Sequence, residues 1–276
     1  MSEVSLDDWV GKSQTVVDAV DVGHAARLAA TLGEAAPAQG EPLSPLWHWC
    51  FFLEGVGMDA LGADGHPARG GFLPPAEGRN RMWAGGRVYF EGPLLAGIEA
   101  QKTSTVTNIT EKQGKTGSLL FVTVAHDISQ DGQRVIREEQ DIVYRVPTPP
   151  KLQGTEQAPA PEWTMTVDPT ATLLFRYSAL TFNGHRIHYD FPYVTQTEGY
   201  PGLVVHGPLI ATSMVQSFRR AHPKARIDHL AYRGLRPLIA PKTFVAGGEL
   251  VEDGLARLWA AQDGTLAHQA ELRFVP

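Results

Sequence analysis

Polar and ionisable side chains are concentrated in the nine residues FNGHRIHYD, positions 182–190. Two imidazoles, His185 and His188, stand three positions apart, and Asn183 and Asp190 flank them. Imidazole titrates near neutral pH and often acts as a general acid or base. An amide such as that of Asn183 can hold a water but cannot accept its proton. The segment is therefore a candidate centre for proton transfer, with His188 as the base.

The same segment could bind a metal through His185, His188 and Asp190. Zinc sites use three or four such ligands in a defined geometry, and the chain contains no HExxH motif and a single cysteine. We therefore expect no metal. The single cysteine, Cys50, lies in the apolar run LWHWCFF and is expected to be a buried, unreactive thiol.

A second segment, HGPLIATSMVQSFRRAHP, begins sixteen residues after the first and is expected to form a helix over 206–223. Pro208 suits the first helical turn, where its missing N–H costs nothing. Gly207 allows another group to approach the backbone closely. The free N–H groups and positive dipole at a helix start attract an anion, such as the oxygen of a thioester that is accepting electrons. One oxyanion-hole donor stabilises such a transition state by roughly 3–4 kcal/mol in other enzymes.

The composition describes a globular protein without an evident nucleic-acid partner. The chain has 276 residues, 43% hydrophobic and 20% charged, and a net charge of −6. A nucleic-acid-binding protein normally carries a basic stripe. The N-terminus is acidic and has no apolar signal region, and no apolar run reaches the roughly 18 residues of a membrane helix. We expect a cytoplasmic protein with no membrane partner.

The elements that position these segments fall into two similar halves. The Pro-rich stretch VPTPPKLQGTEQAPAPEW divides them, and we predict domains at 1–147 and 163–276 with a linker at 148–162. In the first half, residues 46–61 resemble an apolar helix, residues 85–109 a bent strand pair, and residues 118–129 and 133–145 alternate as half-buried strands do. Hairpin turns are expected at EKQGKTG, at SQDGQ and at the Asp263-Gly264 dipeptide.

The two halves contain similar short sequence patterns. RVYFEGPLLAGIEA matches HLAYRGLRPLIAPKT in its aromatic, charged, Gly, Pro and Leu positions, and a QDG turn separates the last two expected strands of each half. A repeat of about 130 residues is too long for a solenoid. We therefore predict a duplicated α+β unit, a double hot dog, in which each unit is a long helix wrapped by an antiparallel sheet. The alternative is two unrelated α+β domains.

Residues 173–209, LLFRYSALTFNGHRIHYDFPYVTQTEGYPGLVVHGPL, resemble the signature of MaoC-like hydratases and dehydratases. They are most similar to the branch of hydroxyacyl-thioester dehydratase type 2, mesaconyl-CoA hydratase and itaconyl-CoA hydratase. RNRMWAGGRVYFEGPLLAG in the first half resembles the degenerate N-terminal domain of that branch, so the resemblance covers nearly the whole chain. It implies a hydro-lyase that adds water reversibly to an α,β-unsaturated acyl-CoA. Coenzyme A thioester is then the substrate, not a cofactor.

One position departs from the wider family pattern D-x-N-P-x-H. Its Asp falls on Asn183, its Asn on His185, its Pro on Arg186 and its His on His188. The resemblance implies that His188 is catalytic and that the Gly207 N–H binds the thioester oxygen. The missing carboxylate leaves two possibilities, Asn183 as a water-positioning partner, which we favour, or Asp190 acting from another angle.

Arginines are expected to decide the acyl group. A five-carbon dicarboxylyl thioester, mesaconyl- or itaconyl-CoA hydrated to citramalyl-CoA, carries a free carboxylate that an arginine binds well. Candidates near the expected site are Arg79, Arg81, Arg87, Arg176 and Arg186. Of these we favour Arg81, Arg176 and Arg186 as substrate-binding residues, together with Tyr177, His185, His206 and Trp83.

Three other functions stay open at this stage. A 3-hydroxyacyl-thioester dehydratase of fatty-acid metabolism would use the same residues. A thioesterase commonly places a carboxylate near the helix, and HGPLIATSMVQSF contains none. A non-catalytic acyl-CoA binder would show no turnover. A double hot dog already contains the pair of units that a single one must assemble, so the protein is expected to be monomeric or a homodimer.

Overall fold

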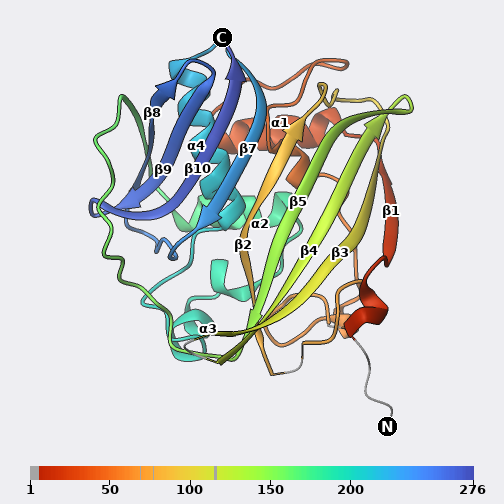
Figure 1. Cartoon of the computed structure of the whole chain (residues 1–276), viewed down its shortest axis with the longest axis vertical. Helices are drawn as coiled ribbons and strands as arrows, with labels where there is room; N and C mark the ends of the chain where they lie inside the picture. The colour runs from red at the N-terminus through yellow and green to blue at the C-terminus, as the bar shows by residue number, and fades with distance from the viewer. Residues whose placement is uncertain (1–5, 69, 77, 115–116) are drawn as a thin grey trace.

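The computed structural model describes residues 6–68, 70–76, 78–114 and 117–276. These residues form one antiparallel ten-stranded sheet with its helices on one face (Figure 1). The strands are β1 (Ser13–Asp18), β2 (Asn80–Phe90), β3 (Ala100–Gly114), β4 (Gly117–Gln130), β5 (Gln133–Arg145), β6 (Trp163–Val167), β7 (Arg226–Gly234), β8 (Phe244–Glu252), β9 (Leu255–Gln262) and β10 (Thr265–Val275).

The strand order shows the duplication directly. Across the sheet the order is β1-β3-β4-β5-β2-β7-β10-β9-β8-β6, so each half follows the same path outward from the central β2–β7 pair. That pair runs from Gly85↔Arg233 to Tyr89↔His229. The predicted double hot dog is confirmed.

The prediction that residues 85–109 form two strands paired with each other is wrong. In the structure β2 pairs with β5 and β7, while β3 pairs with β1 and β4.

The helices are α1 (Val22–Leu32), α2 (Ala171–Leu180), α3 (Phe191–Gln196) and α4 (Gly207–Ala221), with 3-10 turns η1 (Leu6–Trp9), η2 (Trp47–Cys50), η3 (Met58–Ala60) and η4 (Arg186–His188). The predicted helix at 206–223 is confirmed as α4. All residues from Leu209 to Phe218 on this helix are buried, where β6, β8, β9 and β10 wrap around it. Short α1 lies against α2 on the same face.

The predicted helix at 46–61 does not form. Only the two 3-10 turns η2 and η3 occur there, since Leu46 and Phe52 adopt positive φ of 72° and 56° and interrupt any helix. Leu46, Trp47, Cys50, Phe51 and Phe52 are nevertheless buried in the core beneath the first half of the sheet, whereas Leu53, Val56 and Met58 are exposed. Cys50 is 2% exposed, and burial raises the pKa of its thiol to about 12, as expected for an unreactive cysteine.

The hairpin turns follow the sequence. Asp131-Gly132 and Asp263-Gly264 occupy equivalent places in the two halves, and all four residues have positive φ, as in the tight turns that Asp-Gly favours. The EKQGKTG turn joins β3 and β4, which pair up to Gly114↔Gly117; Lys115 and Thr116 within it lie outside the described residues.

One hydrophobic core extends across both halves. It includes Leu28 and Trp47 from the first half and Phe218 and Leu230 from the second. Neither helix nor strand is assigned between Arg145 and Trp163, apart from one bridge between Gln157 and Thr265. The domain limits at 1–147, 148–162 and 163–276 stay a prediction. In the described chain, none of the helices has both the length and the apolar character that crossing a membrane requires.

Candidate active site

The segment 182–190 leaves the end of α2 and turns back over the helical face. The Asn183 N–H donates to the Ser178 carbonyl at 2.8 Å, and Asn183 Oδ1 accepts the His185 N–H at 3.0 Å. This local turn uses the side-chain oxygen of Asn183 and leaves its Nδ2 group as the available donor. The turn leads into η4, which carries His188 inward to 7% exposure.

The His188 ring is held in its neutral form. Its Nδ1 lies 2.7 Å from the Val204 carbonyl, and because a carbonyl only accepts, Nδ1 carries the proton and Nε2 the lone pair. The Val204 N–H in turn donates to the Ile187 carbonyl at 3.0 Å, which fixes the two segments together. Burial, aided by the charge of nearby His185, lowers the His188 pKa to about 3.

His206 stacks on His188 with ring centroids 3.7 Å apart and planes 19° apart. His206 Nε2 lies 2.8 Å from Ser178 Oγ, and the Tyr177 ring meets the His206 ring edge-on at 5.1 Å. Burial places the His206 pKa well below its ordinary value, so both stacked rings are neutral. Ser178 was not predicted from the sequence. Its position five residues before Asn183 in the signature segment is the available signal.

Gly207 begins α4 directly beneath the indole of Trp83. A Cβ at position 207 would lie 2.5 Å from Trp83 Cε3, so only glycine allows this approach. Trp83 stacks on Tyr232 with centroids 4.6 Å apart, and Trp49 meets both rings edge-on at 5.6 Å. Gly207 and Trp83, which were predicted separately as site residues, are thus brought together, and Trp49 and Tyr232 add an aromatic wall that the sequence did not reveal.

A loop of the N-terminal half completes the site from the other side. Asp64 Oδ2 lies 3.4 Å from His66 Nδ1, and the His66 and His185 ring centroids are 4.0 Å apart. Burial alone would raise the Asp64 pKa, but hydrogen bonds from His66 hold it well below its ordinary value. Burial and the charge of His66 lower the His185 pKa to about 3. Asp64 and His66 were missed because they stand about 120 residues from His185 in the sequence.

Arg186 and Asp190 are occupied by each other. Arg186 Nε and Nη2 donate to Asp190 Oδ2 at 2.9 and 2.8 Å, and Asp190 Oδ1 accepts the Tyr193 N–H at 3.1 Å. Asp190 is therefore the cap of α3 and does not partner His188. Arg186 also donates to the Ala63 carbonyl at 3.1 Å. Its guanidinium therefore holds the two segments together and is not available to bind the substrate.

The remaining arginines separate clearly. Arg79 pairs with Glu111, and Arg87 pairs with Glu139 and Asp141. Arg176 lies on the exposed side of α2, whereas Tyr177 and Ser178 face inward.

Arg81 differs from the other arginines near the site. Like Arg176, it is exposed and makes no ion pair within the described ranges, but of the five arginines it is the one whose charge contributes to the lowered His185 pKa. It also projects from the same face of β2 as Trp83, two residues on.

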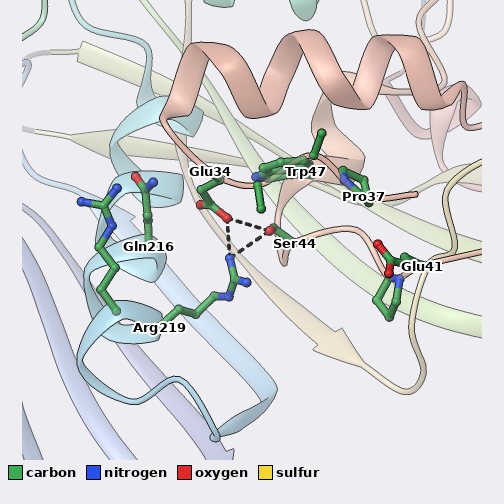
Figure 2. A pocket seen from close by; sticks show the side chains of 11 residues that line it. Glu34, Pro37, Glu41, Ser44, Trp47, Gln216 and Arg219 are labelled. Atoms are coloured by element: carbon green, nitrogen blue, oxygen red, sulfur yellow. Dashed lines mark hydrogen bonds and ion pairs between the residues drawn. The ribbon is translucent and has the colours of Figure 1, made fainter. Parts of the chain in front are cut away.

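A separate pocket of about 380 Å³ lies where the end of α1 meets the end of α4 (Figure 2). Arg219 Nη1 joins Glu34 Oε2 at 2.7 Å and Ser44 Oγ at 2.8 Å across it, as the dashed lines show. The loop that lines it follows α1 as the histidine segment follows α2, yet it carries no histidine. The pocket belongs to the joint between the halves, and none of the predicted site residues lines it.

Sequence comparison finds relatives with acyl-thioester chemistry. The family model for hydroxyacyl-thioester dehydratase type 2 matches residues 46–240. Mesaconyl-C(4)-CoA hydratase of Chloroflexus aurantiacus is 44% identical over 257 residues, covering 89% of this chain and 90% of the relative. Mitochondrial hydroxyacyl-thioester dehydratase type 2 of Schizosaccharomyces pombe is 30% identical over 208 residues, covering 66% and 69%.

Solved structures agree on the fold. A MaoC-like dehydratase from Phytophthora capsici superimposes with a TM-score of 0.73 over 99% of both chains, at 16% identity. HtdX of Mycobacterium tuberculosis gives a TM-score of 0.65, covering 95% of this chain and 99% of that one, at 17% identity.

Proposed function

The chain belongs to the hydroxyacyl-thioester dehydratase type 2 family, and on that basis we propose that it is an acyl-CoA hydratase acting on a dicarboxylyl thioester. The observation that carries the proposal is the pairing of a neutral His188, with its Nε2 lone pair free of a described partner, and the glycine start of α4. Water addition to an enoyl thioester needs these two features, a base for the water and a donor for the thioester oxygen.

The reaction runs through an enolate. His188 Nε2 takes a proton from water as the water oxygen bonds to the β-carbon, and the π electrons move onto the thioester oxygen. The Gly207 N–H, unpaired within its own helix, stabilises the resulting negative charge. The enolate then collapses, and its α-carbon takes the proton back from the His188 imidazolium. The atoms added are those of one water, and the reverse sequence is dehydration.

The neighbouring residues position the reactants. Asn183 Nδ2 donates to the attacking water, while Asn183 Oδ1 holds the loop. His206 and Ser178 fix the plane of the His188 ring through stacking and the 2.8 Å bond. Trp83, backed by Tyr232 and Trp49, forms an apolar wall beside Gly207 against which the acyl group lies.

Arg81 is the proposed receptor of the acyl carboxylate. Among the five arginines near the site it alone combines an electrostatic effect on His185 with the absence of an ion-pair partner in the described residues. The name of the relative at 44% identity specifies mesaconyl-C(4)-CoA, an acyl group with a free carboxylate, which supports the same choice. Mesaconyl-CoA, whose double bond is conjugated to the thioester, is the proposed substrate and gives citramalyl-CoA by this route. Itaconyl-CoA has its double bond β,γ to the thioester, so it can give the same product only after loss of an α-proton and protonation of the γ-carbon have moved the double bond into conjugation.

The test measures ultraviolet loss of enoyl-thioester absorbance with mesaconyl- and crotonyl-CoA, and formation of citramalyl-CoA by chromatography with itaconyl-CoA, whose double bond is not conjugated to the thioester. We expect rapid turnover of the dicarboxylyl substrates and a His188→Ala variant roughly 100- to 10,000-fold slower. Arg81→Met should raise KM for the dicarboxylyl substrates by about tenfold or more while leaving crotonyl-CoA hydration nearly unchanged. Arg79→Met, whose arginine is paired with Glu111, is the matched control.

A different pattern would redirect the proposal. If Arg81→Met weakened all three substrates equally, Arg81 would contact coenzyme A rather than the acyl carboxylate. Preference for crotonyl- or longer enoyl-CoA would favour the second candidate, the 3-hydroxyacyl-thioester dehydratase that the name of the Schizosaccharomyces pombe relative describes. Release of free thiol would indicate a thioesterase.

A further inference from the structure

Two loops from opposite halves of the chain are locked together beside His188. The Arg186 N–H donates to the Asp64 carbonyl at 2.9 Å, and Arg186 Nη1 donates to the Ala63 carbonyl at 3.1 Å. Gly65 and Gly184 approach so closely that a Cβ on either would clash with the backbone of the other. These contacts hold Asp64 and His66 in a fixed relation to His185.

The three side chains form a compact set of possible metal ligands. One ligand atom from each of Asp64, His66 and His185 lies within 4.8 Å of the other two. Asp64 Oδ2 and His66 Nδ1 are 3.4 Å apart, which is longer than an ordinary hydrogen bond. Two ligands on one tetrahedral zinc, each with a bond of about 2.0–2.1 Å, are separated by about 3.3 Å. The observed separation is thus close to that of two zinc ligands.

The backbone already orients the ligands. The His66 N–H donates to Asp64 Oδ1 at 3.1 Å, which leaves Oδ2 directed toward the His66 ring. The His185 N–H is bound to Asn183 Oδ1 at 3.0 Å. A site whose ligands are ordered in advance loses little conformational entropy on binding.

We propose that Asp64, His66 and His185 bind one divalent transition-metal ion of the zinc class and so bridge the two halves of the chain. Two imidazoles and one carboxylate are a ligand set that zinc accepts, with a fourth position left for water. This set differs from the His185, His188 and Asp190 combination considered from the sequence, because the structure engages His188 with Val204 and Asp190 with Arg186. The site is distinct from the proton-transfer pair, although the His185 and His188 ring centroids are only 5.4 Å apart.

The experiment is a Zn²⁺ titration of untagged, chelator-treated protein by calorimetry, repeated with Co²⁺ while its visible ligand-field bands are recorded. We expect one ion per chain, Co²⁺ bands typical of a four- or five-coordinate site with nitrogen and oxygen ligands, and a higher Tm with the ion bound, because only the folded chain assembles the ligands. His66→Gln and Asp64→Asn should each weaken binding by about tenfold or more. Asp59→Asn, an exposed carboxylate of η3 nearby in the sequence, and His229→Gln, a histidine of β7, are matched controls that should bind like the parent protein.

Two outcomes would overturn the proposal. One is the absence of stoichiometric binding by the folded parent protein; the other is binding that His66→Gln and Asp64→Asn leave unchanged. In either case the cluster is a hydrogen-bonded pair with a packed imidazole, and no metal site. Hydration by the metal-free protein is measured separately in the enoyl-CoA assay, so failure of the metal site and failure of the proposed activity are distinguishable.

Discussion

Gly207 is the residue at which a single methyl group has the sharpest expected effect. Its hydrogen points at the Trp83 indole, and an alanine Cβ would lie 2.5 Å from Trp83 Cε3. Either the indole or the first turn of α4 must then move, and the proposed N–H donor to the thioester oxygen moves with it. Removal of one such donor lowers kcat by roughly 100- to 1,000-fold in other enzymes, and we expect Gly207→Ala to fall in that range.

The matched control for this substitution is Gly55→Ala. Gly55 has an ordinary φ, and a Cβ there meets nothing within 4 Å. Steady-state hydration of the enoyl-CoA substrate, with a thermal unfolding curve for each variant, separates loss of catalysis from loss of folding. Wild-type kcat in a folded Gly207→Ala protein would contradict the role given to the α4 start.

At the scale of elements, the hydrogen bonds within η4 and α3 determine which polar side chains of this segment remain available to bind substrate or water. Asp190 both caps α3 and receives Arg186, and these bonds, the Tyr193 N–H first, hold its pKa below the ordinary value. Asp190→Asn should therefore lower Tm while leaving kcat within about threefold of wild type, because Asp190 has no part in the proposed proton transfer.

Asn183→Ala should lower kcat by roughly 10- to 100-fold, since the attacking water would lose its proposed donor.

The two variants discriminate between the partners considered for His188. Both are to be assayed on the same dicarboxylyl-CoA, with Tm recorded for each. A large loss of kcat in Asp190→Asn at full folding, with little loss in Asn183→Ala, would return the catalytic partnership to the carboxylate.

Elements were predictable where the signal was local. The alternation within β4 and β5, the two Asp-Gly turns and the His-Gly-Pro start of α4 each depend on a few adjacent residues. The run at 46–61 was misread because a continuous apolar stretch has no period that separates a helix from an irregular buried segment. Leu46 and Phe52 adopt positive φ there, a conformation that is rare for residues other than glycine and that the apolar run does not predict.

At the scale of the whole molecule, the contacts between the two halves could not be predicted from the sequence. Arg186 meets Ala63 across 123 positions, and Gly207 meets Trp83 across a similar span. Such pairs decide which arginine is free and which carboxylate is near, and no pattern within either half indicates them. The proposed catalytic pair could be named from the sequence because His188 and Gly207 both lie within one specific segment.

The continuous sheet and shared core also imply that the chain unfolds as one unit, so its stability should depend on pH through its buried histidines. His268 on β10 is 7% exposed, and burial, with the nearby charge of Arg236, lowers its pKa to about 4 from 6.5. The unfolded chain therefore binds a proton below pH 6.5 that the folded chain does not accept until about pH 4. Above pH 6.5 the neutral ring does not reduce the free energy of unfolding. As the pH falls from 6.5 toward 4, protonation of this ring in the unfolded chain lowers the free energy of unfolding, by at most about 3 kcal/mol.

Urea unfolding at pH 7.5, 6.0 and 5.0 measures this effect in the wild type and in His268→Gln. The wild type should lose more stability on acidification than the variant does, because the buried rings of His185, His188 and His206 still contribute in both proteins while His268 contributes only in the first. The difference between the two proteins should approach one proton taken up on unfolding near pH 5. Equal acid sensitivity of the two would mean that His268 titrates in the folded protein much as it does in water, and that β10 opens to solvent far more readily than its burial indicates.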